Sequence, residues 1–195
     1  MSKKQDELCK FVLDNYEDLG AAAKVFDMGK EHLHEWVKMT VYEALKEDNE
    51  HSGFETILEE NEILWWLSDS DKLWLDQENS KGLFFSLQIE ADYSNSIVQP
   101  TEDEIYLCLY HSADSPTQKG KVNKLRAHIL SYKGVIKKEG FSMKDEDGCL
   151  VGYTPSHELN LTAIRDENRF PADIVKKARK FTDTLLPIVQ KYKTK

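Results

Sequence analysis

The stretch GLFFSLQIEADY, residues 82–93, decides the fold class, because its apolar residues recur at every second position. Successive side chains of a β-strand point to opposite faces, so this period predicts a strand with one buried face. The residues expected on that face are Leu83, Phe85, Leu87, Ile89 and Ala91. The intervening positions become polar along the stretch, which is typical of a strand whose second face is less buried.

Three neighbouring segments extend this strand into a sheet. EIYLCLYH, residues 104–111, predicts a second strand after a polar loop. Phe141–Glu146 and Cys149–Tyr153 flank Asp147-Gly148, a dipeptide that favours the tight turn of a β-hairpin. ELNLTAI, residues 158–164, alternates in the same way and predicts a further strand.

The N-terminal quarter predicts helices instead. Apolar residues at helical spacing indicate one helix over Asp6–Asp18, which Gly20 would end. Asp27 is a suitable cap for a longer helix that carries Leu33 to Leu45. Residues 54–67 fit either an amphipathic helix or a strand, and both readings stay open.

Two more helices are expected in the C-terminal half. One carries the apolar residues from Val122 to Tyr132 and would end at Gly134. The other begins near Pro171, and Pro187 inside it predicts a kink or an early end. Its apolar stripe is continuous: Ile174, Ala178, Phe181, Leu185, Ile188 and Tyr192.

These elements predict an α+β protein. We expect an N-terminal helical subdomain, residues 1–68, followed by an antiparallel sheet with two packed helices, residues 69–195. A single continuous unit is the alternative. The stripe of the last helix would pack on the sheet or on a second copy of the chain, so a homodimer is a further expectation.

Charge is distributed unevenly along the 195 residues. The net formal charge is −9, but residues 1–110 carry −16 and residues 111–195 carry +7. Residues 47–110 alone carry −14. A field of one sign attracts partners of the other, so the acidic segment predicts affinity for a basic protein, with a solvated face as the alternative.

Residues 22–37, AAKVFDMGKEHLHEWV, resemble the helix-turn-helix of Fis-like and homeodomain-like DNA-binding proteins. Ala23 stands at the small position where two helices touch, and Asp27 stands where the turn is expected. The resemblance implies that the second helix enters the major groove of duplex DNA. Its outward side chains would be Lys30, Glu31, His32, His34, Glu35 and Lys38. A plain helical hairpin is the alternative.

Tryptophans cluster in the acidic segment. Trp65, Trp66 and Trp74 predict a protein-recognition patch, because Trp is enriched among the residues that dominate binding energy at interfaces. The alternative is that these indoles fill the junction between the helices and the sheet.

A metal-dependent hydrolase is the third hypothesis. From residue 54 onward the order of elements looks like the core of the PD-(D/E)XK nucleases, and Asp76, Glu90 and Asp92 would supply carboxylates. That family needs an acid-x-lysine pair, and this chain has Glu90-Ala91-Asp92, so the lysine expected to activate water is missing. We therefore expect no catalytic residues, no metal site and no cofactor.

Cysteine usage and hydropathy bear on location. Cys9, Cys108 and Cys149 are odd in number and lack metal-ligand spacing, which favours a reducing compartment over a disulfide framework. No apolar run approaches the length of a membrane span. We expect a cytoplasmic protein that does not bind a membrane.

The sequence thus predicts a non-enzymatic binding or regulatory protein, associated with DNA through residues 30–38. The alternative is an acidic module that engages a basic protein, such as one whose nucleic-acid site the acids imitate.

Overall fold

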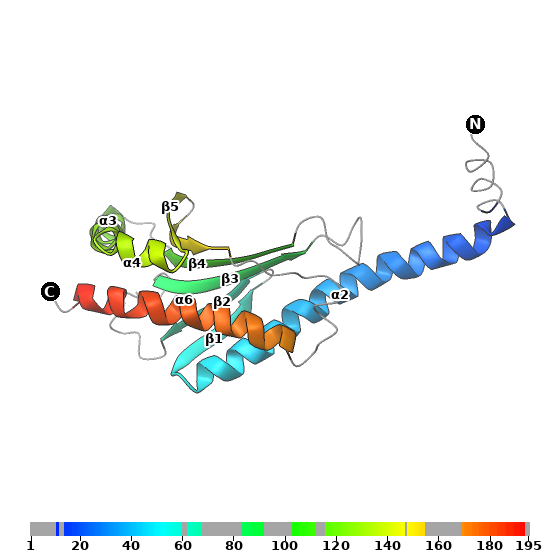
Figure 1. Cartoon of the computed structure of the whole chain (residues 1–195), viewed down its shortest axis with the longest axis horizontal. Coiled ribbons are helices and arrows are strands. Elements are labelled where there is room, and N and C mark those ends of the chain that lie inside the picture. The colour runs from blue at the N-terminus through cyan, green and yellow to red at the C-terminus, as the bar shows by residue number, and fades with distance from the viewer. Residues whose placement is uncertain are drawn as a thin grey trace.

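The computed structural model describes residues 11, 14–59, 62–67, 83–91, 103–111, 116–146, 148–154 and 169–193. They form an antiparallel sheet with helices packed on it, which confirms the predicted α+β class (Figure 1). In chain order the elements are α2 (Tyr16–Glu50), β1 (Phe54–Glu59), β2 (Glu62–Leu67), β3 (Leu83–Ala91), β4 (Asp103–His111), α3 (Pro116–Leu130), α4 (Lys133–Lys138), β5 (Ser142–Glu146), β6 (Cys149–Tyr153) and α6 (Arg169–Lys193).

The six strands of the described residues are ordered β1-β2-β3-β4-β6-β5, and every pair is antiparallel. β3 and β4 pair over nine residues each and form the centre of the sheet. Leu83, Phe85, Leu87 and Ile89 are buried, as the alternation in residues 82–93 predicts. The hairpin predicted around Asp147-Gly148 is confirmed as β5 and β6, and Gly148 adopts the left-handed φ of 87° that such a turn favours.

β1 and β2 resolve the ambiguity of residues 54–67, because these residues form a hairpin and not a helix. The hairpin precedes residue 68, yet it belongs to the same sheet as β3 through the pairing of β2 with β3. Cross-strand pairing explains the choice: Trp65 lies opposite Phe85 on β3, and burial of these rings favours the strand.

α6 carries the apolar stripe that the sequence predicts, and the stripe is buried against the sheet. Ile174, Ala178, Phe181 and Leu185 are each at most 1% exposed. The C-terminal half of α2 contributes Val37, Val41 and Leu45 to the same core. Arg179 of α6 donates to Asp48 of α2 through Nε at 2.9 Å, which ties the two helices together.

Two predicted helix boundaries in the N-terminal quarter are wrong. α2 runs without interruption from Tyr16 to Glu50, so Gly20 does not end a helix and Asp27 does not start one. A single Gly weakens a helix by about 1 kcal/mol relative to Ala, and here Ala21 to Ala23, the strongest helix formers, follow it directly. The turn that a helix-turn-helix requires is therefore not formed.

Two boundaries in the C-terminal half also differ from the prediction. α3 ends at Leu130, and Gly134 lies inside the short helix α4. α6 passes through Pro187 to Lys193, so the helix does not end early. Pro187 and Asp183 are exposed, which lets water hydrate the Asp183 carbonyl that loses its amide partner. The strand expected over residues 158–164 lies outside the described residues.

Trp65 is fixed by a hydrogen bond in the centre of this core. It is fully buried, its ring stacks on Phe85 at 5.7 Å, and its Nε1 donates to Thr182 Oγ1 of α6 at 3.1 Å. An unsatisfied buried N–H costs about 1–3 kcal/mol, so this bond fixes how α6 lies on the sheet.

We expect Thr182→Val to lower the free energy of unfolding by about 1–3 kcal/mol, because it leaves the buried indole N–H without an acceptor at nearly constant side-chain volume. Urea denaturation followed by tryptophan fluorescence measures the change. Thr182→Ser keeps the acceptor and is the matched control. A loss in Thr182→Ser with none in Thr182→Val would show that the methyl group, and not the hydrogen bond, stabilises the contact.

Candidate functional site

The residues predicted to contact DNA lie on the uninterrupted helix α2, and those described do not share one outward face. His32 and Glu35 are exposed, but Lys38 is only 7% exposed. Lys38 Nζ lies 2.8 Å from Glu35 Oε1, so its charge is paired within the helix. The side chains of Lys30, Glu31 and His34 lie outside those described. Lys38 therefore does not point outward with His32 and Glu35, because its position on α2 turns it toward the body of the protein.

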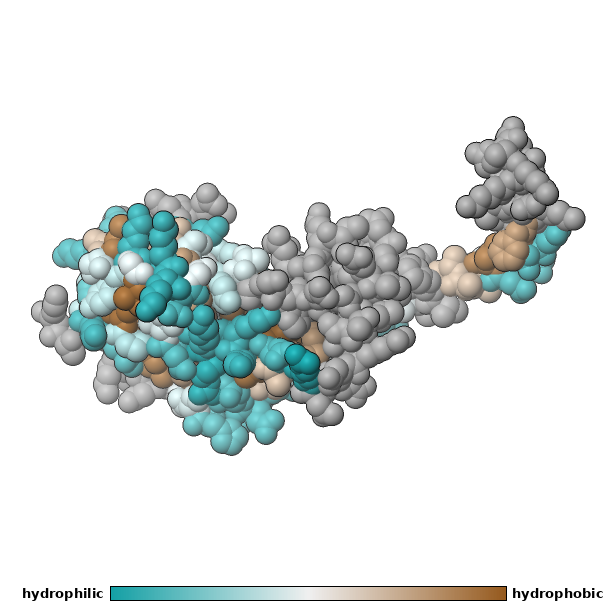
Figure 2. Space-filling model, viewed as in Figure 1, coloured by the Kyte–Doolittle hydropathy of each residue, from teal (hydrophilic) through white to brown (hydrophobic). Residues whose placement is uncertain are grey.

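The N-terminal half of α2 extends well away from the sheet (Figure 1). The helix has 35 residues and is about 52 Å long, and Leu33 is the first of its described side chains that packs against the core. Every residue from Glu17 to Lys24 is exposed, Leu19 among them. Figure 2 shows tan and brown residues at this end of the helix, among hydrophilic ones. Apolar residues of α2 are therefore left accessible to a partner.

The three tryptophans of the predicted recognition patch are not brought together. Trp65 lies in the core, in agreement with the alternative that the indoles fill the junction between the helices and the sheet. Its burial rules out contact with a partner. Trp66 points to the opposite face of β2 and is half-buried. Trp74 lies outside the described residues. Alternation along a strand separates neighbouring side chains, which is why the adjacent Trp65 and Trp66 have different environments.

Carboxylates gather instead around the end of α2 and the hairpin that follows it. Among the described residues from Glu43 to Glu62 there are seven acids and one lysine, Lys46. We call six of these acids the acidic edge: Glu43, Glu47, Glu50, Glu55, Glu59 and Glu62. Five are exposed, and Glu62 is half-buried.

The seventh acid, Asp48, does not belong to this surface, because it is paired with Arg179. The hydrogen bond to Asp48 raises the already high pKa of the Arg179 guanidinium further. The six carboxylates of the acidic edge have no such basic partner among the described residues. Glu62 accepts a hydrogen bond from the neutral side chain of Gln88. The local field is therefore strongly negative.

β1 is an edge strand of the described sheet. It pairs with β2, and no described strand pairs with its other side. Glu55 and Glu59 are exposed on the face away from the core, and Ile57, 37% exposed, lies between them. Exposed edges can accept a further strand, and charged side chains are the usual protection against unwanted pairing.

Carboxylates of the proposed hydrolase site are not assembled in the described part of the chain. No group of three His, Cys, Asp or Glu residues there is close enough to hold a metal ion. Glu90 lies on β3 opposite Glu104, while Asp76 and Asp92 lie outside the described residues.

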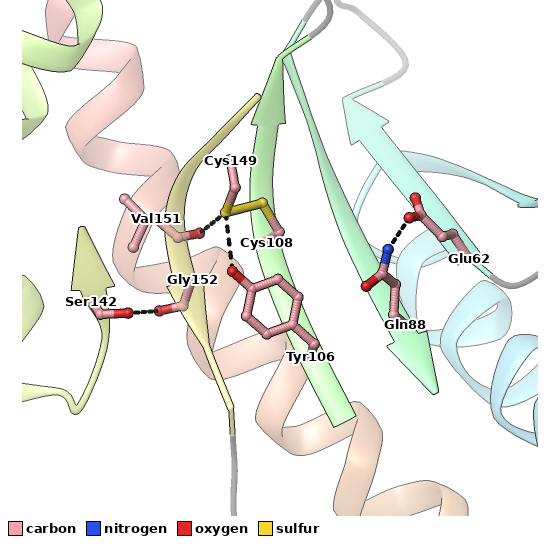
Figure 3. Close-up of a disulfide and its surroundings, with 8 residues drawn as sticks. All are labelled: Glu62, Gln88, Tyr106, Cys108, Ser142, Cys149, Val151 and Gly152. Atoms are coloured by element: carbon pink, nitrogen blue, oxygen red, sulfur yellow. Dashed lines mark hydrogen bonds between the residues drawn. A yellow bond between two sulfur atoms is a disulfide. The ribbon is translucent and has the colours of Figure 1, made fainter. Parts of the chain in front are cut away.

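A disulfide joins Cys108 of β4 to Cys149 of β6, with Cα atoms 5.9 Å apart (Figure 3). The expectation that the cysteines form no disulfide is wrong. Their sequence separation of 41 hides the fact that β4 and β6 are neighbours in the sheet. The cysteine pattern therefore no longer supports a reducing, cytoplasmic location.

The disulfide lies on the sheet face opposite the core, in a row of small residues. Ser86, Cys108 and Gly152 are register partners across β3, β4 and β6. Tyr106 Oη lies 3.4 Å from Cys149 Sγ (Figure 3). A Cβ at Gly152 would overlap the hydroxyl of Tyr106, so this position requires glycine for close approach and not for its φ.

Comparison with models of protein families, with curated proteins and with solved structures finds no match to this chain. Among the described helices, none has the length and apolar character needed to cross a membrane.

We expect Cys108→Ser to lower the thermal midpoint by about 10 °C under oxidising conditions. Closing a loop of this length stabilises a protein by about 4 kcal/mol in the chain-entropy model, and each kcal/mol is worth about 2–4 °C at this size. Differential scanning fluorimetry with and without a dithiol reductant measures the effect. The reductant should destabilise the wild type and Cys9→Ser but leave Cys108→Ser unchanged. A wild type insensitive to reductant would contradict a stabilising bond.

Proposed function

We propose that this protein is a non-enzymatic binding module that engages a basic segment of a protein partner through the acidic edge and strand β1. The observation that carries the proposal is an edge strand that presents Glu55 and Glu59 on either side of the exposed Ile57. Backbone groups at such an edge offer affinity, and the side chains around them offer selectivity.

Side-chain chemistry favours a partner strand with a basic, an apolar and a basic residue at every second position, so that all three lie on one face. In a strand added beside β1, residues opposite Glu55 and Glu59 would meet carboxylates, and the residue between them would meet Ile57. Lysine or arginine at the flanking positions gains from the negative field, whereas acidic residues are repelled. The same field speeds the encounter with a basic partner.

This proposal replaces DNA recognition by residues 30–38. Without a turn near Asp27, α2 cannot present the second helix of a helix-turn-helix, and Lys38 is buried beside Glu35. The acidic edge would also repel the phosphates of DNA.

We expect a labelled peptide with lysine, valine and lysine at every second position, and threonine between them, to bind the protein saturably in fluorescence anisotropy at low salt. The double variant Glu55→Lys/Glu59→Lys should bind roughly tenfold more weakly or worse, since each reversal replaces an attraction with a repulsion. Glu17→Lys/Asp18→Lys makes the same change in net charge on the projecting part of α2 and is the matched control.

Backbone pairing has a separate test. Methylating alternate amide nitrogens on the edge of the peptide that faces β1 removes hydrogen-bond donors without changing charge, and should weaken binding. Binding that is equally strong after methylation, or equally weakened in the α2 control, would contradict strand addition at β1.

A further inference from the structure

A second charged surface, of opposite sign, lies on helices α3 and α4. Residues 116–138 contain seven basic residues and no acidic residue. They are Lys119, Lys121, Lys124, Arg126, Lys133, Lys137 and Lys138. This segment is distinct from the acidic edge and from every residue of the proposed function.

Five of these lysines are exposed: Lys119, Lys124, Lys133, Lys137 and Lys138. We call them the lysine surface. None of the five pairs with a carboxylate of the described residues. By contrast, the nearby Lys180 on α6 pairs with Glu139 at 3.1 Å. The charge of the lysine surface is therefore not neutralised within the described part of the protein.

Core packing holds these lysines outward. Val122, Leu125 and Ile129 of α3 are buried in the core, and so is Ile136 of α4. α3 is about 22 Å long at 1.5 Å per residue, and its lysines lie away from the buried stripe. Two rigid helices thus present ammonium groups along an extended path, and not at one point.

The acidic edge does not cancel this positive field. α4 contacts β5 at one edge of the sheet, whereas the acidic edge surrounds β1 at the other. Five strand spacings of about 4.8 Å separate the two edges by about 24 Å. This exceeds two Debye lengths at physiological salt, so the field of the acidic edge is largely screened at α3 and α4.

We propose that the lysine surface binds the phosphate backbone of duplex DNA without sequence preference. Lysines spaced along two helices suit a linear polyanion, whose charges continue along the whole path. α3 also presents Asn123, an exposed polar side chain of the kind that contacts phosphate and sugar.

An anionic membrane is the competing partner. Leu130 and Val135, 47% and 49% exposed, lie at the junction of α3 and α4, and Figure 2 shows brown residues among teal ones at this end of the molecule. These two aliphatic side chains are confined to the junction, whereas lysines continue along α3 as far as Lys119, where no exposed large apolar residue accompanies them. The distribution favours DNA over lipid.

The test is fluorescence anisotropy of a labelled random-sequence 20-base-pair duplex, titrated with the full chain between 20 and 200 mM salt, conditions in which phosphate contacts give a steep salt dependence. We expect saturable binding whose logarithm falls linearly with the logarithm of salt concentration. Lys124→Ala/Lys137→Ala should reduce the slope by about two, because each lost phosphate contact removes about one released counterion. Lys24→Ala/Lys46→Ala removes two exposed lysines from α2 and should leave the slope unchanged.

Leu130→Ser/Val135→Ser separates DNA from lipid. It should leave duplex binding unchanged, and sedimentation with vesicles of phosphatidylcholine and phosphatidylglycerol should recover little of any variant. An unchanged thermal midpoint shows that a variant is folded. A variant that is not folded is replaced by another in which different lysines of α3 and α4 are changed to alanine. Flat anisotropy, a slope equally reduced in the α2 control, or vesicle binding that the serine variant abolishes would each overturn the proposal. None of these outcomes depends on the peptide bound at β1.

Discussion

Burial of the α6 stripe against one face of the sheet is the constraint on which the rest of the structure depends. Phe181 lies at its centre, edge-on to Phe85 at 6.1 Å and to Phe141 at 5.0 Å, so it joins the middle of the sheet to the segment that leads into β5. The neighbouring Thr182 accepts the indole hydrogen of Trp65 and sets the position of α6 along β2. Burial of apolar side chains thus provides most of the free energy that holds α6 on the sheet, and one hydrogen bond fixes its position along β2.

Strand order converts a charge pattern in the sequence into a charge pattern in space. The acidic hairpin β1–β2 is placed at one edge of the sheet, and β5, which α4 contacts, is placed at the other. A different connection of the same strands would have brought glutamates and lysines together as internal ion pairs. Here they remain apart, so each surface keeps a field of its own sign.

The alternation of apolar residues and the turn dipeptide made the strands predictable from the sequence, but these local signals do not predict contacts between distant residues. β3 and the β5–β6 hairpin could be predicted because alternation and the Asp147-Gly148 turn are local signals. The continuity of α2 could not be predicted, because Gly20 and Asp27 are residues that commonly stand at helix ends. Whether the helix continues through them depends on the helix propensity of the residues around them. Trp65 and Trp66 form one cluster in the sequence, but strand geometry places them on opposite faces. Of the predicted sites, the acidic segment was visible in the charge count, whereas the burial of Lys38 depends on how α2 packs.

The pairing of Cys108 with Cys149 shows the same limit and has a structural consequence. The two residues are 41 positions apart, and only the adjacency of β4 and β6 makes them neighbours. The loop that they close contains all of α3 and α4, and therefore the whole lysine surface. Among the described strands β5 pairs only with β6, so fraying of this edge would otherwise loosen the connection from α4 back to the sheet. With the bond in place, both ends of the loop stay tied together on β4 and β6, and the lysines would keep their outward direction if β5 frayed.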